Sequence, residues 1–223
     1  YQESRPQTVG APQRNVFRDA VHAYGQVLRN RHYLIHAALL AASFGTMFAY
    51  ITGSSAVFID MLGVSSGVYG MLFALTAAGT IIGAAAGGRL ARVWSADRLL
   101  IGGVLGSGVI SLLLLLASTL GLGSIALIAA CVVLSNICAG IVMPNATHQA
   151  LASVGNVAGS AAALLRSMQM LAGAAAGGLV GVLAGNQLTV MATVMTIAAL
   201  IGVALIFVRQ TLLGSPTSPA DAR

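Results

Sequence analysis

Six long apolar runs constrain the fold of this chain more than any other feature. They cover about residues 33–58, 67–88, 99–119, 123–146, 160–184 and 188–208. Each is long enough to cross a bilayer as a helix, which takes about 20 residues, and none alternates with the period of two expected for barrel strands. Only 7% of the residues are charged, whereas soluble domains carry about 25%. The sequence therefore predicts an all-α membrane protein, a six-transmembrane-helix bundle.

The basic residues are all arginine, and they are distributed unevenly between the connections. They lie before the first run, between the second and third, and after the fourth and sixth, as Arg5, Arg14, Arg18, Arg29, Arg31, Arg89, Arg92, Arg98, Arg166, Arg209 and Arg223. The connections 59–66, 120–122 and 185–187 carry none. Because cytoplasmic loops are enriched in basic residues, we expect a multi-pass protein of the cell inner membrane with both termini cytoplasmic.

Three segments are predicted along the chain. Residues 1–32 form a cytoplasmic linker in which apolar residues recur at helical spacing from Val16 to Leu28. Such an amphipathic helix lies either on the membrane surface or on the protein itself. Residues 33–208 form the six-helix bundle, and 209–223 form a polar cytoplasmic tail. Since the chain begins with a tyrosine and lacks a signal-peptide pattern, we expect a fragment of a longer protein.

Glycines recur at every fourth position in three of the runs. The sets are Gly79, Gly83 and Gly87; Gly102 and Gly106; and Gly173, Gly177, Gly181 and Gly185. A spacing of four places small residues on one stripe of a helix, where they allow close helix–helix contact in lipid. The stripes predict either static packing or surfaces on which helices slide, and the pattern favours neither.

Acidic residues are missing from all six runs, with Asp60 just past the first and Asp97 in the loop before the third. His36, near the start of the first run, can titrate or be a simple interfacial residue. Asn136 and Gln169 are costly to bury, so they bond across helices or line a wet cavity. No metal-ligand cluster, carboxylate pair or nucleophile–base pair predicts an enzyme, and no cofactor is expected.

The stretch from Met143 to Arg166 interrupts the apolar pattern. We expect Pro144 and Asn145 to end the fourth helix, because proline cannot donate the next backbone hydrogen bond. Arg166 then falls about one and a half turns into the fifth helix. It either snorkels toward the cytoplasmic headgroups or faces a water-filled cavity and meets an anionic group.

Two segments resemble transporters of the major facilitator superfamily. GAAAGGRLARVWSADRLL (83–100) resembles the second copy of that superfamily's cytoplasmic loop signature, with Gly87, Arg89 and Arg98 as matching positions. PNATHQAL (144–151) followed by GNVAGSAAALL (155–165) resembles the connection of the tenth and eleventh helices in the bicyclomycin/chloramphenicol-resistance (Bcr/CflA) branch of drug–proton antiporters. The matching positions there are Pro144, Asn145, Ala146, Ala150, Leu151, Gly155, Ala158, Gly159, Ser160, Ala161, Leu164 and Leu165.

Further stretches extend the resemblance to nearly the whole chain. Residues 50–75 resemble the seventh and eighth helices of that branch, and the opening QES fits the end of its sixth. Arg166 departs from the pattern, since a small residue is expected there. The resemblance implies that the chain is the C-terminal half, one half of a twelve-helix major facilitator fold. The family's proton-coupling acidic residue would then belong to the other half.

The implied function is multidrug or small-solute efflux by proton antiport with alternating access. The implied partners are a small-molecule substrate, membrane lipid and the N-terminal half of the same transporter, with the first, second, fourth and fifth spans facing the substrate. The predicted substrate contacts are Met47, Tyr50, Phe73, Asn136, Gln169 and Met170. The predicted gate or loop-motif residues are Arg89, Arg98, Pro144, Asn145 and Arg166.

Other functions fit parts of the same pattern. A non-transporting membrane scaffold, a half-size relic, or a major facilitator carrier of a metabolite would show the same spans and the same arginine distribution. Nucleic acid is not an expected partner, because the arginines do not form a patch interleaved with aromatic residues.

Overall fold

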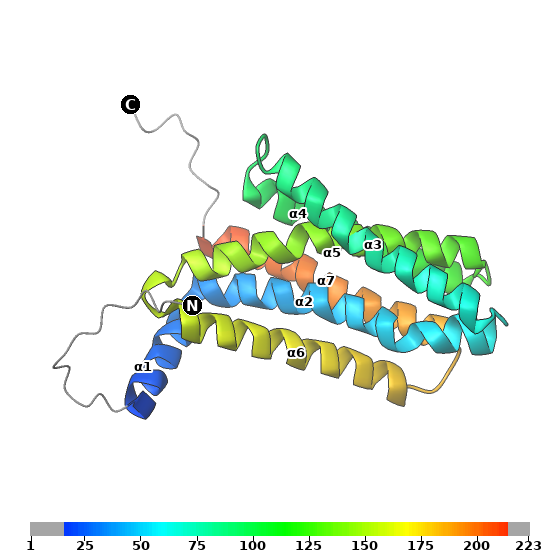
Figure 1. Ribbon diagram of the computed structural model, residues 1–223, viewed down its shortest axis with the longest axis horizontal. Coiled ribbons are helices and arrows are strands. Elements are labelled where there is room, and N and C mark those ends of the chain that lie inside the picture. The colour runs from blue at the N-terminus through cyan, green and yellow to red at the C-terminus, as the bar shows by residue number, and fades with distance from the viewer. Residues whose placement is uncertain (1–15, 214–223) are drawn as a thin grey trace, which may run out of the picture.

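The computed structural model describes residues 16–213, and this part of the chain is helical, with short connections and no strand (Figure 1). The elements are α1 (Val16–Arg29), α2 (Arg31–Ser55) with the π-helical extension η1 (Ala56–Met61), α3 (Ser66–Leu90), α4 (Ala96–Thr119), α5 (Ile125–Ala152), the 3-10 turn η2 (Gly155–Val157), α6 (Ala158–Val182) and α7 (Gln187–Leu213). Within the described range, six helical segments are long and apolar enough to cross a membrane. The predicted all-α fold with six spans is confirmed.

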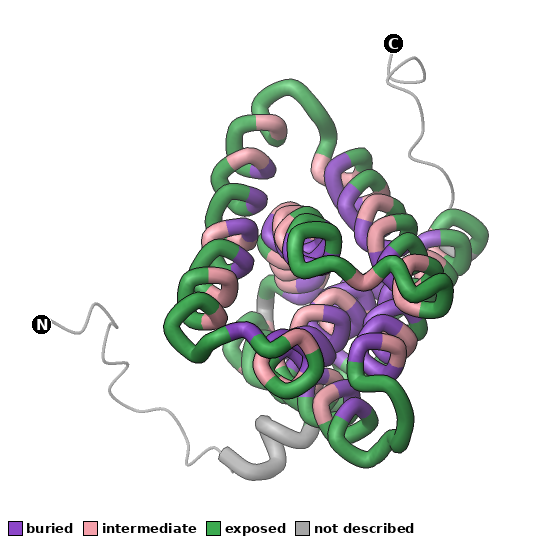
Figure 2. Tube along the Cα trace, turned by 90° about the vertical axis from the view of Figure 1, so that its right-hand side faces the viewer, coloured by how far each residue is buried: buried purple, intermediate pink, exposed green. Residues whose placement is uncertain are grey.

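The long helices form two layers. Helices α6, α2, α5 and α3 lie side by side in that order, because α2 packs against both α6 and α5, and α5 packs against α3 (Figure 1). Helices α4 and α7 pack on each other and behind α5 and α2. Buried residues concentrate on the inward sides of the helices (Figure 2). The opposite face of the α2–α5 pair has no comparable covering helix in the described chain.

Helices α3 and α5 approach closely because glycines lie between them. A side chain at Gly83 would run into the backbone of Ile137, and one at Gly140 would run into the backbone of Thr80. The same contact includes Gly79 and Gly87. Removing the Cβ atoms lets the two backbones touch, which replaces the missing hydrophobic drive between helices in lipid. The contact stripe predicted for the second span is therefore confirmed.

The other two glycine stripes are confirmed only in part. On α6, Gly173 lies against Phe44 and Gly177 lies against Thr52, both on α2. The next two glycines differ, since a side chain at Gly181 would meet nothing within 4 Å, and Gly185 lies beyond the end of α6. On α4, likewise, Gly106 lies against the sulfur of Cys138, whereas Gly102 has no neighbour that close.

Helix α5 continues through Pro144, so the prediction that Pro144 and Asn145 end this helix is wrong. Side-chain bonds to the helix's own carbonyls reinforce the chain on both sides of the ring. The Nδ2 of Asn145 donates to the carbonyl of Ile141 at 2.7 Å, and the Oγ1 of Thr147 donates to the carbonyl of Met143 at 2.8 Å. Proline is tolerated in membrane helices where neighbours and hydroxyl side chains support the backbone in this way.

Packing holds the extra turns of α5 beyond the proline. Ala146 and Ala150 are fully buried in the core that α2 and α6 share. The helix therefore ends at Ala152, and the connection to α6 is the short segment that includes the turn η2. Gly155 starts that turn, and Gly159 already lies in α6, which begins at Ala158.

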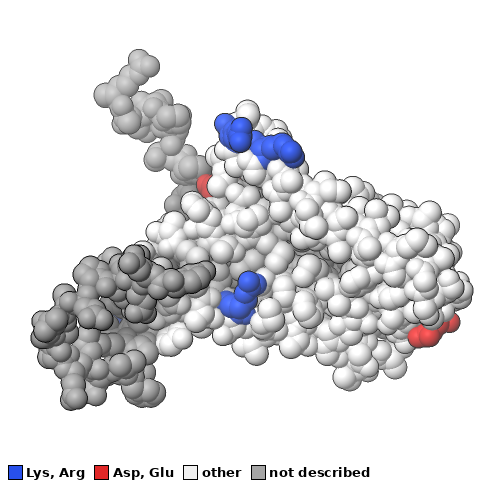
Figure 3. Space-filling view, viewed as in Figure 1, with Lys and Arg blue, Asp and Glu red and all other residues white. Residues whose placement is uncertain are grey.

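The arginine-bearing connections gather at one end of the bundle, called the basic end below. Helices α3, α5 and α7 end there, and α2, α4 and α6 begin there. Figure 3 shows basic side chains on the half of the molecular surface next to the α3–α4 turn, and none at the opposite tip of this face. The uneven distribution of arginines along the sequence thus becomes one charged end of the fold.

Asp60 and Asp97 lie inside helices, contrary to the prediction that placed Asp60 past the first span and Asp97 in the loop before the third. Asp60 lies in the π-helical extension η1, because the first span continues to Met61. Asp97 lies in the first turn of α4, where a negative charge suits the helix dipole. Its carboxylate also pairs with Arg209 of α7 and so ties two helices together at the basic end.

The end of α1 is docked on the protein. This helix packs against α6 and α2, and its Val27 is fully buried. Tyr24 and Leu28 are exposed. Docking was one of the two alternatives for the amphipathic segment. The predicted linker before Val16 and the tail after Leu213 lie outside the described residues.

Candidate functional site

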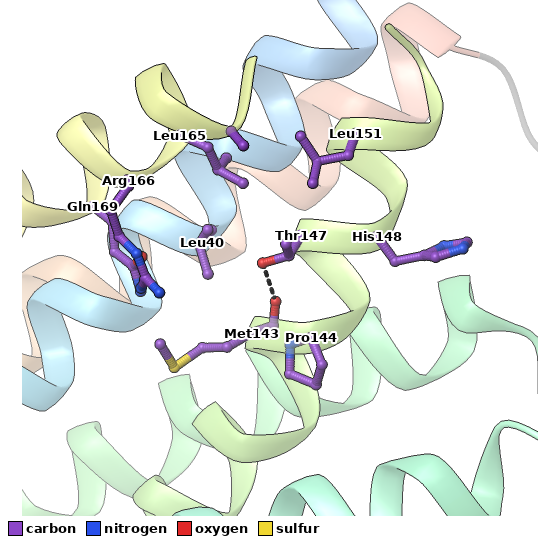
Figure 4. Close-up of a pocket in the computed structure, with 10 residues that line it drawn as sticks. Leu40, Met143, Pro144, Thr147, His148, Leu151, Leu165, Arg166 and Gln169 are labelled. Carbon is purple, nitrogen blue, oxygen red and sulfur yellow. Dashed lines mark hydrogen bonds between the residues drawn. The ribbon is translucent and has the colours of Figure 1, made fainter. Parts of the chain in front are cut away.

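A cavity of about 480 Å³ lies between α2, α5 and α6 (Figure 4). Its wall comprises Leu40 of α2, Met143, Pro144, Thr147, His148 and Leu151 of α5, and Ala162, Leu165, Arg166 and Gln169 of α6. The cavity exists because α5 and α6 barely contact each other. Both of these helices pack against α2, α6 more closely than α5. The cavity lies in the half of the bundle nearer the basic end, where α5 ends and α6 begins.

Arg166 brings a positive charge to this cavity. Since α6 begins at Ala158, the residue lies about 12 Å into the helix at a rise of about 1.5 Å per residue, deeper than predicted. Its Nη1 donates a hydrogen bond of 2.8 Å to the Oε1 of Gln169, which lies one turn further from the start of α6. The guanidinium therefore extends away from the nearer helix end, opposite to the snorkelling alternative. It lines the cavity as in the other alternative, but its partner is the neutral amide of Gln169 and not an anionic group.

The two alternatives predicted for the buried amides each apply to one residue: Gln169 lines a cavity, and Asn136 bonds across helices. Gln169 is only 3% exposed, lines the cavity and bonds within its own helix. Asn136 is 5% exposed and bonds across helices, because its Nδ2 donates to the carbonyl of Thr76 on α3 at 3.0 Å. One amide therefore holds a charged side chain at a cavity, and the other joins two helices.

A second polar cluster, formed by Tyr50, Thr76 and Asn136, joins α2, α3 and α5. The hydroxyl of Tyr50 donates to the Oγ1 of Thr76 at 3.0 Å, since that Oγ1 donates to the carbonyl of Phe73 at 2.7 Å. The rings of Tyr50 and Phe73 also stack, with centroids 6.2 Å apart. Tyr50, Thr76 and Asn136 are all buried. Each of the three side chains thus has a bonding partner within the protein, and the three are called the saturated cluster below.

The sequence matches a known family over most of its length. Residues 2–177 match the family described as Major Facilitator Superfamily. The chain belongs to this superfamily. It is also 30% identical over 185 residues to YdgK of Bacillus subtilis (strain 168), described as an uncharacterized MFS-type transporter, in an alignment that covers 82% of this chain and 45% of the relative. The chain thus spans about half the length of this curated relative.

Membership of the superfamily makes this chain a multi-pass membrane protein of a transporter family, as its six apolar helices indicate. The layer of α6, α2, α5 and α3 consists of the spans predicted to face the substrate. Helices α4 and α7, the spans predicted to lie outside, form the layer behind. The open cavity and the saturated cluster both belong to the first layer.

The structure divides the predicted substrate residues of this superfamily member between two places. Tyr50, Phe73 and Asn136 lie together in or beside the saturated cluster. Gln169 lines the cavity. The two methionines lie in neither place: Met47 is half-buried on α2, and Met170 on α6 is 47% exposed.

The predicted gate and loop-motif residues also separate. Pro144 and Arg166 both line the cavity, from α5 and α6. Asn145, next to the proline, bonds to its own helix. Arg89 and Arg98 are exposed at the turn between α3 and α4.

Apart from Pro144, the sequence-based prediction missed the α5 side of the cavity. Met143, Thr147 and Leu151 recur at every fourth position, the spacing of one helix stripe. A helix end predicted at Pro144 places Thr147 and Leu151 outside the helix, so the pattern does not indicate the stripe. Figure 4 shows Thr147 turned toward the carbonyl of Met143, whereas the ring of His148 points away from Arg166.

Thr76, the centre of the saturated cluster, was also missed. Serine and threonine in helices often bond to their own backbone, so a single threonine in an apolar run gives no signal. Only the tertiary structure shows that its hydroxyl and its carbonyl each receive a side chain from another helix.

Proposed function

We propose that this chain is the C-terminal half of a major facilitator exporter of the Bcr/CflA type, which removes drugs or other small solutes by proton antiport. The open cavity between α2, α5 and α6 is the observation that supports this most strongly. Its wall is mostly hydrocarbon, with two polar residues on α5, Thr147 and His148, and two on α6, Arg166 and Gln169, as in sites for small amphipathic molecules.

Alternating access needs a second bundle, which would be the N-terminal half of the same transporter. It would cover the face that α4 and α7 leave open, so that the cavity lies at the interface of two bundles that rock against each other. The relative that is twice as long supports such a partner. The basic end would lie in the cytoplasm by the positive-inside rule.

Each predicted residue has a role in this proposal. Gln169 and Arg166 meet the substrate directly, and Pro144 shapes the opposite wall. Met47 and Met170 add adaptable apolar surface where the two bundles meet. The remaining predicted residues act indirectly: Tyr50, Phe73 and Asn136 hold α2, α3 and α5 together, while Arg89, Arg98 and Asn145 belong to the cytoplasmic end of the pathway.

A carrier of a metabolite is the second candidate. Arg166 favours it, because many metabolites carry carboxylate or phosphate groups that pair with a guanidinium. A non-transporting scaffold has no comparable support, since it needs neither an open cavity nor a charged group inside it.

Drug accumulation in cells tests export. The full-length protein is expressed from its complete reading frame, and intracellular chloramphenicol is measured with and without a protonophore. We expect lower accumulation in expressing cells, restored by the protonophore. Gln169→Ala should weaken export several-fold, because it removes a polar wall group and the partner of Arg166.

Ser167→Ala is the matched control for this experiment. Ser167 is exposed on the same helix, and its hydroxyl bonds only to the carbonyl of Ala163 among the described residues. This variant should export normally. Equal accumulation of chloramphenicol and of other hydrophobic drugs in expressing and non-expressing cells would reject drug export.

A further inference from the structure

We infer that the cavity between α2, α5 and α6 selects amphipathic organic anions, and that Arg166 is the residue that determines this specificity. The ligand class is an apolar body with one carboxylate, sulfonate or phosphate group. The inference rests on the proposed transport function and narrows its substrate class.

The charge of the cavity is the first reason. Among the residues that the structure describes, its wall contains Arg166 and no acidic residue. Asp97 and Asp60 lie elsewhere, since Asp97 pairs with Arg209 and Asp60 lies at the end of the bundle opposite the basic end. Arg166 is an exposed residue at the side of the cavity, and among the described residues its guanidinium bonds to the neutral amide of Gln169 and has no partner of opposite charge. An anionic ligand supplies this partner, whereas a cationic ligand would be repelled.

The hydrogen-bonding capacity of Arg166 is the second reason. A guanidinium carries five N–H donors in one plane and can bind a carboxylate through two parallel bonds. Among the described residues, its side chain donates one bond, to Gln169. This bond fixes the orientation of the planar group and leaves most donors for a ligand. Gln169 therefore orients the guanidinium of Arg166, and this guanidinium contacts the anionic group of the ligand.

The rest of the wall suits the apolar part of the ligand. Leu40, Met143, Leu151 and Leu165 supply hydrocarbon surface from all three helices. The hydroxyl of Thr147 is not a free donor for the anion, because it already donates to the carbonyl of Met143 (Figure 4). The charge of Arg166 together with this hydrocarbon surface favours an amphipathic ligand rather than a small inorganic ion.

Binding of three probes that share one ring system tests the inference. The probes are 2-naphthoate, 2-naphthamide and 2-naphthylmethylammonium, which are anionic, neutral and cationic. Their dissociation constants are measured on the full-length protein in phosphatidylcholine nanodiscs. We expect the naphthoate to bind at least about tenfold more tightly than the amide, and the ammonium to bind most weakly.

Variants of Arg166 assign the preference to its guanidinium. Arg166→Gln should remove the tenfold preference while leaving the affinity for the amide within about twofold. Arg166→Lys keeps the charge and should retain the order of the three probes, with a weaker naphthoate complex because the bidentate geometry is lost. Arg92→Gln, which removes an exposed arginine at the α3–α4 turn, should change nothing.

An anionic lipid headgroup shares the chemistry of this ligand class, so a second set of nanodiscs contains phosphatidylglycerol. Retained naphthoate binding there supports a free organic anion. Loss of that binding would assign the site to the lipid and overturn the inference. It would also be overturned by equal binding of the three probes, by no binding at all, or by a preference that survives Arg166→Gln. Export of chloramphenicol is measured separately, so failure of anion selection leaves the proposed function standing.

Discussion

Helix α5 contacts α3 on one side and diverges from α6 on the other, and the two sides differ in the size of their residues. Toward α3, Gly140 of α5 and Gly83 of α3 bring the two backbones into contact. Toward α6, Met143, Thr147 and Leu151 line a cavity. In lipid, close packing of small residues holds helices together. One side of α5 is therefore built to stay closed, and the other leaves room for a ligand.

The buried polar groups follow the same division. At the closed side, the amide of Asn136 is bonded to Thr76 of the neighbouring helix. At the open side, Arg166 bonds to Gln169 of its own helix and keeps further donors for a ligand. In this bundle, the polar residue whose partner lies on another helix is structural. The polar residue whose neighbouring helix lies further away is available to bind a ligand.

Breaking the closed side should have the largest effect. Gly83→Leu places a side chain against the backbone of Ile137, which cannot move without shifting α5. Overpacking of a tight core costs about 1–3 kcal/mol and sometimes more, so we expect little folded protein. The amount of folded protein is measured as the yield of monodisperse full-length protein in size-exclusion chromatography. Gly102→Leu, where the new side chain would meet nothing within 4 Å, should fold normally. Equal yields of the two variants would contradict close α3–α5 packing.

Removing a hydrogen bond at the closed side, without introducing a steric clash, should have a smaller effect. Asn136→Ala removes the bond to Thr76, and bonds between membrane helices contribute roughly 0.6 kcal/mol on average and up to about 1.7 kcal/mol. We expect a lower free energy of unfolding by about 1 kcal/mol, measured by unfolding in mixed micelles, and an unchanged preference among the three naphthyl probes. A changed probe preference with unchanged stability would place Asn136 in the binding site instead.

The features that hydropathy and spacing determine could be predicted from the sequence. The six spans follow from the lengths of the apolar runs, and the α3 contact follows from Gly79, Gly83 and Gly87, which leave a stripe that a partner helix must fill. The fate of Pro144 could not be predicted in this way. Whether a proline ends a helix depends on packing further along, here of Ala146 and Ala150.

The cavity could not be predicted because it depends on the distance between two helices. Nothing in the sequences of α5 and α6 states that they diverge, and the cavity wall depends on that divergence. The direction of Arg166 depends in turn on the cavity and on Gln169, three residues later. The sequence indicated that an arginine at this depth has two alternatives, and only the arrangement of the helices selects between them.

Replacing Pro144 at the open side should have the smallest effect. Because α5 is already helical on both sides of Pro144, Pro144→Ala adds no helical turns and supplies one backbone N–H. A single hydrogen bond contributes about 1 kcal/mol. We expect unchanged helical content in far-UV circular dichroism and a slightly higher free energy of unfolding. Asn145→Ala keeps the proline but removes the bond to Ile141, and it should lower stability slightly. A gain of helical signal in Pro144→Ala would mean that the proline ends α5 after all, and that the α5 wall of the cavity is not formed as described.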